Sequence, residues 1–330
     1  MSQLSPTIPR LLLACALASV SGSATANLIV DYQSGSISNP VHRLAEFRDD
    51  GTFVRELATG LPLGSNTHLA EVGPLIYRSS SVTDAPIHVL DRNGNLVRTV
   101  FNDAVYGNST AVRGMTTDFD GTSVFFSDAY AGSNILYHLD DPVSGASSQF
   151  TNTFYSGELG RAATGHTPQG DFVFELHFVH PDIGPDRIDV TDVNGDRARN
   201  ITNASLDVPY ANGDGDLVVD PSTGNVFVAT SQDILVFDPG SALISQFSYA
   251  HAYPRLEFTP GGRLVAASVN DGSISFYSQS GTLLDSWSVG ADARVRDVIY
   301  VNAVPEPSTI ILAAVGFVAL LACRRRRHAE

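Results

Sequence analysis

Apolar residues in the middle of the chain come in short runs of β-branched and aromatic residues, separated by Gly, Asp, Asn and Pro. The pattern is clearest over 216–247, where four apolar runs occupy 217–219, 226–229, 234–237 and 243–247. Pro and Gly residues mark turns between them at 221–224 and 239–240. Such runs predict strands rather than helices, so we expect an all-β fold. Four short antiparallel strands per unit is the plan of one β-propeller blade.

The four-strand unit repeats along the chain. Residues 256–287 follow the same order of strands and turns, and looser versions occupy 87–101 and 124–150. The turn between the third and fourth runs, often written Asp-x-x-Gly, serves as a marker for each unit. The marker glycines recur every 46 residues or so, about the length of a propeller blade. They are Gly51, Gly94, Gly145, Gly195, Gly240 and Gly281.

The two ends of the repeat region together supply one more period. The apolar run 298–301 can serve as the first strand of a blade whose other strands come from 28–30, 41–47 and 53–57. Pairing the chain ends removes exposed strand edges, which is why propellers close in this way. We therefore predict a six-bladed β-propeller over 27–303, closed by the N- and C-terminal strands. Seven blades is the alternative, because the stretches around Gly145 and Gly195 are the longest and least regular.

The segment Asp220-Pro221-x-x-Gly224-Asn225 and the strands that follow it resemble the NHL and YVTN families of propeller repeats. The resemblance covers two blades well and the other four weakly. It implies a propeller fold, and a fold alone implies no function.

The N-terminus has the features of a secretory signal peptide. Arg10 precedes an apolar run over 11–18, and small residues end in Ala24-Thr25-Ala26, an A-x-A cleavage pattern. We expect a signal peptide over 1–26. A lipoprotein box at Leu13-Ala14-Cys15 is the less favoured alternative, because cleavage there would leave only a short apolar run after Arg10.

Removing the two terminal segments makes the charge of the body more extreme. Residues 27–303 contain 15 Arg, no Lys and 33 Asp plus Glu, a formal charge of −18. Such a surface repels phosphate backbones, so nucleic-acid binding is not expected. The two cysteines, Cys15 and Cys323, lie in the terminal apolar runs. The body therefore has no disulfide, thiolate metal site or cysteine nucleophile, and its stability must come from a packed core.

A three-part segment follows Ala303. Residues 304–308 read Val-Pro-Glu-Pro-Ser and predict a stiff linker, since two prolines cannot continue a β-ladder. Residues 309–323 carry no charge and predict a short transmembrane helix. Residues 324–330 begin with four arginines and predict a cytoplasmic tail, which places the propeller on the other side of the membrane.

This order of parts is similar to the PEP-CTERM protein-sorting signal of exopolysaccharide-producing Gram-negative bacteria. The resemblance implies recognition near Pro305, Glu306 and Pro307 by an exosortase, a membrane-embedded cysteine protease, followed by removal of the anchor. It also implies an exported protein, anchored in the inner membrane before processing and then at the cell surface, in the outer envelope or outside the cell. A plain tail anchor after an extended linker is the alternative.

In a propeller the first strand of each blade lines the central channel. The residues that enter these strands form our candidate ligand site at the channel rim, and most of them are arginines. We expect them to bind an anionic group such as a uronate or carboxylate through bidentate guanidinium bonds. The favoured alternative is that each arginine pairs with a neighbouring acid. The six residues are His68, Arg113, Arg161, Asp216, Arg255 and Arg296.

Other polar motifs favour ordinary structure over a metal site. His177 and His180 are three apart on an expected strand, so their side chains point to opposite faces. The groups Asp192/Asn194/Asp196 and Asn212/Asp214/Asp216 resemble calcium loops in part, but they lack the required glycine and glutamate or run straight into a strand. We expect turns there.

A metal cage like that of gluconolactonase-related propellers, which use Glu, Asn and Asp, would draw on Glu71, Glu257, Asn270 and Asp271. No spacing in the sequence supports it, and the alternative stays open.

No G-x-S-x-G, H-E-x-x-H or phosphate-binding glycine loop occurs, so we assign no catalytic residue, metal or cofactor. We expect a binding or interaction module in the cell envelope or exopolysaccharide matrix, with an anionic glycan or envelope protein as partner. The alternative is an extracellular hydrolase, lactonase or lyase with its site over the channel. Three polar side chains converging on a metal-sized point would favour the enzyme, and an apolar plug would favour the binding module.

Overall fold

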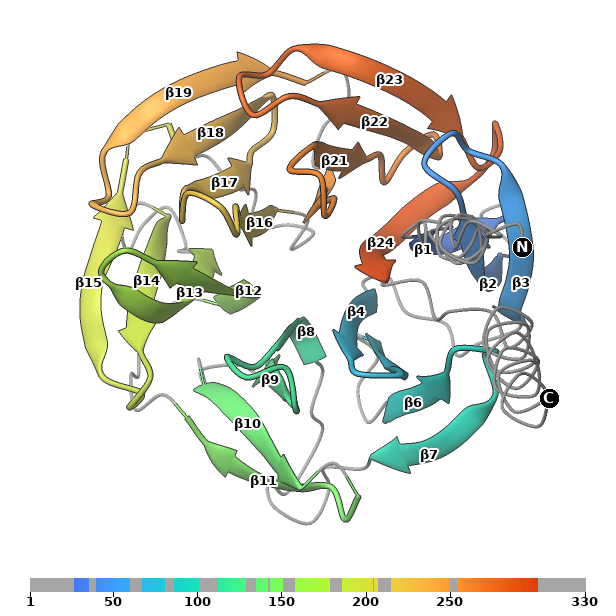
Figure 1. Ribbon diagram of the computed structural model, residues 1–330, viewed down its shortest axis with the longest axis horizontal. Coiled ribbons are helices and arrows are strands. Elements are labelled where there is room, and N and C mark those ends of the chain that lie inside the picture. The colour runs from blue at the N-terminus through green and yellow to red at the C-terminus, as the bar shows by residue number, and fades with distance from the viewer. Residues whose placement is uncertain are drawn as a thin grey trace, which may run out of the picture. The chain divides into compact units, whose positions relative to one another are not determined.

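The computed structural model places 24 strands in six antiparallel sheets of four, arranged as a ring within Asn27–Val301 (Figure 1). The expected all-β, six-bladed propeller is confirmed, and the seven-bladed alternative is wrong. The structure describes residues 27–35, 40–59, 67–80, 86–100, 112–128, 135–141, 143–150, 158–178, 186–203, 205–206, 215–249 and 254–301. The expected signal peptide, linker, transmembrane helix and tail lie outside these residues, as does His180. Within them, no helix is long and apolar enough to cross a membrane.

Each blade is one sheet, and five of the six follow chain order. These are β4 (Thr67–Val72), β5 (Leu75–Ser80), β6 (Ile87–Asp91) and β7 (Leu96–Val100); β8 (Val112–Thr117), β9 (Val124–Asp128), β10 (Ile135–Asp141) and β11 (Ala146–Gln149); β12 (Glu158–Thr167), β13 (Gly170–Phe178), β14 (Arg187–Asp192) and β15 (Arg197–Thr202); β16 (Asp216–Val219), β17 (Val226–Ala229), β18 (Asp233–Phe237) and β19 (Leu243–Ser248); and β20 (Arg255–Phe258), β21 (Leu264–Ala267), β22 (Ser273–Tyr277) and β23 (Leu283–Ser288).

The sixth blade joins the two ends of the ring, as expected. Its order is β24 (Arg294–Val301), β1 (Asn27–Ser34), β2 (Val41–Phe47) and β3 (Phe53–Thr59). Strand β24 pairs antiparallel with β1, with Asn27 opposite Val301 and Gln33 opposite Arg294. No blade is therefore left with an open inner edge at the chain ends.

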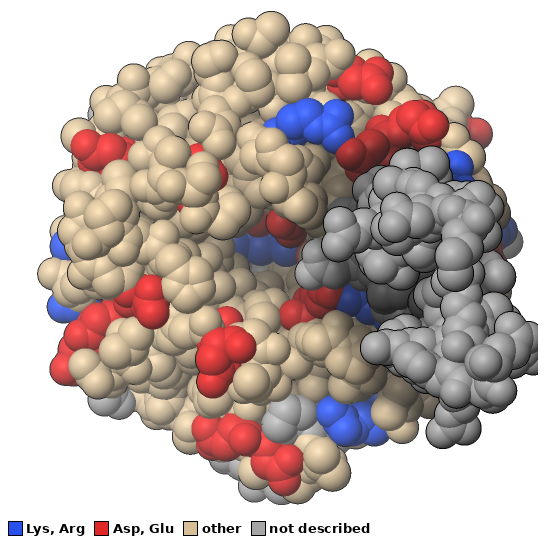
Figure 2. Space-filling model, in the orientation of Figure 1, with Lys and Arg blue, Asp and Glu red and all other residues tan. Residues whose placement is uncertain are grey.

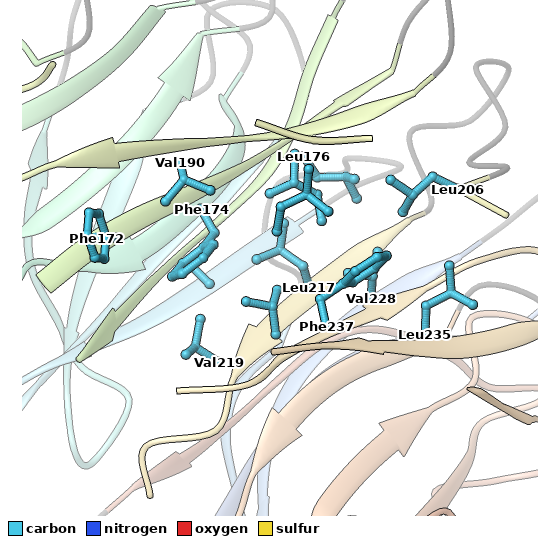
Figure 3. Packing of buried hydrophobic residues seen from close by; sticks show 14 residues of the cluster. Phe172, Phe174, Leu176, Val190, Leu206, Leu217, Val219, Val228, Leu235 and Phe237 are labelled. Atoms are coloured by element: carbon cyan, nitrogen blue, oxygen red, sulfur yellow. The ribbon is translucent and has the colours of Figure 1, made fainter. Parts of the chain in front are cut away.

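The described residues form six apolar clusters that hold the blades together, one at each junction between neighbours. The largest has fourteen buried residues and joins the β12–β15 blade to the β16–β19 blade; in Figure 3, Leu217 lies between Phe174 of one sheet and Phe237 of the other. The smallest has four, Phe125, Leu136, Ala162 and Val173, and joins the β8–β11 blade to the β12–β15 blade. Middle strands such as β17 are buried on both faces because blades pack on either side, whereas outer strands such as β19 are largely exposed.

The marker turns are also packing points. Gly51, Gly94, Gly145, Gly195 and Gly281 all adopt positive φ between 79° and 84°. In the turn that follows β18 the equivalent residue is Ser241, with φ 80°, so the marker expected at Gly240 lies one residue later. Several of these glycines also contact the outer strand of the preceding blade. A Cβ on Gly94 would lie 1.9 Å from the carbonyl oxygen of Leu57.

Replacing Gly94 with Ala is expected to destabilise the protein by about 3 kcal/mol or more, because strain from positive φ adds to a backbone clash. Gly121→Ala is the matched control. Gly121 has φ 72° but no atom within 4 Å of the added Cβ, so about 1–2 kcal/mol of backbone strain is expected alone. Urea denaturation of both variants measures the difference, and equal losses would refute the packing role of Gly94.

Candidate functional site

The first strands of the six blades enclose the centre of the ring. They contact one another in the closed cycle β4, β8, β12, β16, β20, β24 and back to β4. Figure 2 shows a hollow at the ring centre, with both basic and acidic side chains on its walls. The candidate rim residues all lie on these inner strands, as expected from the blade repeat.

Most of the candidate rim residues are buried rather than exposed around the opening. His68, Arg161, Asp216 and Arg255 are at most 4% exposed, and Arg296 is half-buried. The side chain of Arg113 lies outside the described residues. The structure therefore places all six on the inner strands but buries four of the five side chains that it describes, and anion binding by them stays a prediction.

One ion pair crosses the channel. Arg161 on β12 reaches Asp297 on β24, which belongs to the opposite blade, with 3.3 Å between Nη1 and Oδ2. The same guanidinium lies 3.6 Å, Nε to Oδ1, from Asp216 on the neighbouring β16. All three side chains are at most 6% exposed. The alternative in which each arginine pairs with a neighbouring acid is therefore realised between Arg161 and Asp216, whereas the contact with Asp297 across the channel was not expected from the sequence.

Polar contacts made by inner-strand residues bridge every junction of the ring. Each contact joins one inner strand to the next, so polar side chains and backbone groups on the channel wall also tie the blades together. They run from Thr117 Oγ1 to Glu71 O (2.8 Å), Thr164 Oγ1 to Thr117 O (2.9 Å), Arg161 Nε to Asp216 Oδ1 (3.6 Å), Leu256 N to Asp216 Oδ2 (2.8 Å), Arg255 Nε to Arg296 O (2.9 Å) and Leu69 N to Asp297 Oδ2 (2.6 Å).

Two carboxyl groups near the channel have raised pKa values. Burial raises the pKa of Glu257 to about 8, and the charges of Asp297, Asp216 and Glu71 add to the effect. Burial likewise raises the pKa of Asp297 to about 6, against the opposing charge of Arg161. Glu257 Oε1 accepts a hydrogen bond from the Phe258 N–H at 2.9 Å. A carboxylic acid that stays protonated near neutral pH can donate a proton, so Glu257 has the pKa expected of a general acid.

The structure does not assemble the metal cage suggested by gluconolactonase-type propellers. Glu71 is held by Arg92, and Asp271 accepts from the Ser273 N–H at 3.0 Å in the turn between β21 and β22. Among the described residues, no three His, Cys, Asp or Glu side chains are grouped so as to hold a metal ion.

The expected Asp192 turn is confirmed. Asp192 Oδ1 accepts backbone N–H bonds from Asn194 and Asp196, at 2.9 and 3.0 Å. Asn212 and Asp214 of the second calcium-like segment lie outside the described residues.

Sequence reasoning missed a buried polar cluster between the β8–β11 and β12–β15 blades. Glu175 and His177 share a face of β13 with Val173, and that face packs at the junction with the smallest apolar cluster. His177 Nε2 lies 3.3 Å from Asp189 Oδ2, and Thr191 donates to Glu175 at 2.7 Å. The alternation of Glu175 and His177 with apolar residues marked β13 as a strand, but gave no sign that its polar face was buried.

Burial sets the ionisation of this cluster. It raises the pKa of Glu175 to about 8, with a further contribution from the charge of Asp189. It lowers the pKa of His177 to about 3, helped by the positive charge of Arg187. At neutral pH the cluster therefore holds a neutral imidazole beside a largely protonated Glu175.

A second buried pair joins the closing blade to the next one. Arg78 Nε on β5 lies 2.6 Å from Asp31 Oδ2 on β1, and neither side chain is exposed. Asp31 directly follows the apolar run 28–30.

The comparisons with known proteins agree with this description. Residues 303–327 match the PEP-CTERM protein-sorting motif. The chain thus carries this motif after a six-bladed propeller, as expected from the resemblance. The motif implies an exported protein that an exosortase processes at the membrane. No curated protein matches the chain.

Solved propellers are similar in structure but distant in sequence. TolB from Acinetobacter baumannii has a TM-score of 0.63 and 15% identity, with 90% of this chain and 74% of that chain covered. The periplasmic gluconolactonase of Pseudomonas aeruginosa has 0.52 and 13%, with 84% and 99% covered. A catalytically inactive virginiamycin B lyase from Staphylococcus aureus, solved with quinupristin, has 0.52 and 9%, with 81% and 86% covered. At such identities they share the fold alone.

Replacing Arg161 with Met is expected to cost about 3–5 kcal/mol of unfolding free energy, because Asp216 and Asp297 would remain buried without their shared cation. The double variant Arg161→Met/Asp297→Asn should recover part of this loss, since it removes one of the stranded charges. Urea denaturation of the wild type, the two single variants Arg161→Met and Asp297→Asn, and the double variant gives the coupling. A double variant less stable than Arg161→Met would contradict the channel-crossing pair.

Replacing Glu175 with Gln is expected to make stability less sensitive to pH between about 4.5 and 8. The folded-state pKa of Glu175 is raised to about 8 from an ordinary value of 4.5, so the folded protein binds the extra proton. The wild type should lose stability relative to the variant as pH rises from about 4.5 to 8, by on the order of a few kcal/mol. Denaturant midpoints across this range test it. Asp285→Asn, on the exposed strand β23, controls for removal of one negative charge, and a parallel pH profile for wild type and Glu175→Gln would refute the claim.

Proposed function

We propose that the protein is an exported propeller that acts as a binding or interaction module in the cell envelope or extracellular matrix, held at the membrane until its C-terminal segment is removed. The PEP-CTERM motif over 303–327 supports export and exosortase processing. The propeller supplies a rigid body on which surface residues can be presented, a common use of this fold.

The observation that carries the binding role is the ion pair between Arg161 and Asp297 across the channel. Arg161, Asp216 and Asp297 therefore make contacts that join the blades to one another. We place the ligand outside the channel, at the end of the ring from which the inner strands start. There, the half-buried Arg296 is the candidate rim residue best placed to meet an anionic group.

An extracellular hydrolase, lactonase or lyase is the second candidate, and one observation favours it. Glu257 combines a position on the inner strand β20 with a pKa near 8, which suits a general acid. The neighbouring Asp297, with a pKa near 6, would be its partner, although it is also held by Arg161 and the Leu69 N–H.

The test is titration of the purified protein with polygalacturonate, a polymer of uronates, with uncharged dextran as the control ligand. We expect saturable binding of the uronate polymer that weakens with salt and falls about tenfold in Arg296→Gln, since a charge-assisted bond contributes roughly 1.5–3 kcal/mol. The matched control, Arg294→Gln, changes an arginine on the same strand.

Equal binding to dextran and the uronate polymer would contradict the anionic-ligand proposal. Cleavage of the polymer that is lost in Glu257→Gln would establish the second candidate instead.

A further inference from the structure

The exposed large apolar side chains of the described residues all lie at one level of the ring. Each belongs either to the turn between the third and fourth strands of a blade or to the first two residues of the fourth strand. All six blades contribute, so we call this set the apolar rim. Its members are Phe53, Val54, Leu96, Val97, Val143, Val193, Leu243, Ile244, Leu283 and Leu284, between 37% and 77% exposed.

The apolar rim repeats a local structure. In four blades an apolar pair opens the outer strand. In three of them the first member pairs with the last residue of the third strand, as Leu243 does with Phe237, and in the β4–β7 blade Leu96 pairs with Leu90, one residue before the end of β6. The register then shifts, so the second member, here Ile244, is the extra residue of a bulge. Both side chains of the pair are exposed to solvent, although the neighbouring positions of the outer strand are mostly polar.

The chain leaves the propeller at the same end. Across the closing blade, Val301 is opposite Asn27, Leu28 is opposite Phe47, and Phe47 is opposite Phe53 of the apolar rim. The end of β24 and the rim thus lie at one end of the strands. The inner strands start at the opposite end, where the candidate ligand residues lie.

Only seven residues, 302–308, separate Val301 from the uncharged run over 309–323. An extended chain of this length spans at most about 25 Å. If the uncharged run is in the bilayer, this end of the propeller must stay near the membrane surface. We infer that the apolar rim rests on the lipid surface while the chain is anchored, a step that relies on the proposed membrane anchoring.

A flat partner fits the distribution of these residues better than a protein partner does. The rim residues are spread over all six blades around the ring, whereas a protein interface is one continuous patch with an apolar centre. Exposed aliphatic and aromatic side chains enter the interfacial region of a bilayer favourably.

The negative charge of the same turns determines which lipid headgroups we expect the rim to contact. Asp50, Asp91, Asp141, Asp192 and Asp238 lie in or beside them and would be repelled by anionic headgroups. A zwitterionic surface is therefore the expected contact, and contact should weaken as anionic lipid is added.

The test uses the full chain in phosphatidylcholine vesicles, with Cys15 and Cys323 replaced by Ala and a single cysteine labelled with an environment-sensitive fluorophore. Leu96→Cys and Leu243→Cys place labels on opposite blades of the rim. Gln232→Cys, in the exposed turn between β17 and β18 at the other end of the ring, is the matched control. These positions are exposed, so labelling should leave folding unchanged.

We expect emission from both rim labels to shift to shorter wavelength on vesicles and to be quenched by nitroxides attached to lipid, with no change at Gln232→Cys. Replacing part of the phosphatidylcholine with phosphatidylglycerol should reduce both effects. A response at one rim position only, or equally at Gln232→Cys, would overturn the inference.

A blue shift without lipid that grows with protein concentration would also overturn it, and would identify a second copy of the chain as the partner. Failure of the chain to float with vesicles would refute membrane anchoring and the rim contact together. Polygalacturonate binding needs no lipid, so failure of the rim contact alone leaves the ligand-binding proposal standing.

Discussion

Ring closure through β24 and β1 is the constraint on which the rest of the molecule depends. Antiparallel pairing of Asn27–Ser34 with the end of the described chain gives the sixth blade its inner strand, and only then can the inner strands form a complete cycle. The inner cycle in turn positions Arg161 opposite Asp297. Without closure, the β4–β7 and β20–β23 blades would each lose the apolar and polar contacts of one junction.

The junctions balance apolar packing and buried charge differently around the ring. Fourteen buried apolar residues join the β12–β15 and β16–β19 blades, whereas four join the β8–β11 and β12–β15 blades, where Glu175, His177 and Asp189 are also buried. The pair of Asp31 and Arg78 supplements the junction beside the closing blade. Burying polar and charged groups costs desolvation, so contacts of this kind add less net stability than apolar packing does.

The blade repeat was predictable because short strands and turn glycines produce a recognisable pattern in the sequence: apolar runs separated by glycine-containing turns. Gly51, Gly94 and Gly281 mark turns whose positive φ favours glycine, and their spacing predicts six blades and closure. The sequence pattern did not identify Ser241, because it is not a glycine. It nevertheless adopts the same positive φ, and its N–H donates to the Asp238 carbonyl as in the other marker turns.

The interior of the site was harder to foresee. The entrance of each inner strand could be located, but whether Arg161 faces solvent or reaches Asp297, 136 residues away, depends on the curvature of the whole ring. Glu175 and His177 alternate with apolar residues as exposed positions do, because strand periodicity distinguishes two faces without saying which neighbour covers them. The apolar rim likewise emerges only when the same bulge is compared across blades.

Closure by β24 also sets an order for the folding of the ring. Among the described strands β24 is the last along the chain, and until it pairs, β1 has an unpaired edge and the ring has a gap. Joining segments separated by so much chain is a slow, high-contact-order step. The sorting motif begins at residue 303, directly after β24, so the strand that closes the ring and the motif are neighbours in the sequence. The last contacts of the ring are therefore made by the stretch of the propeller that lies nearest in the chain to the sorting motif.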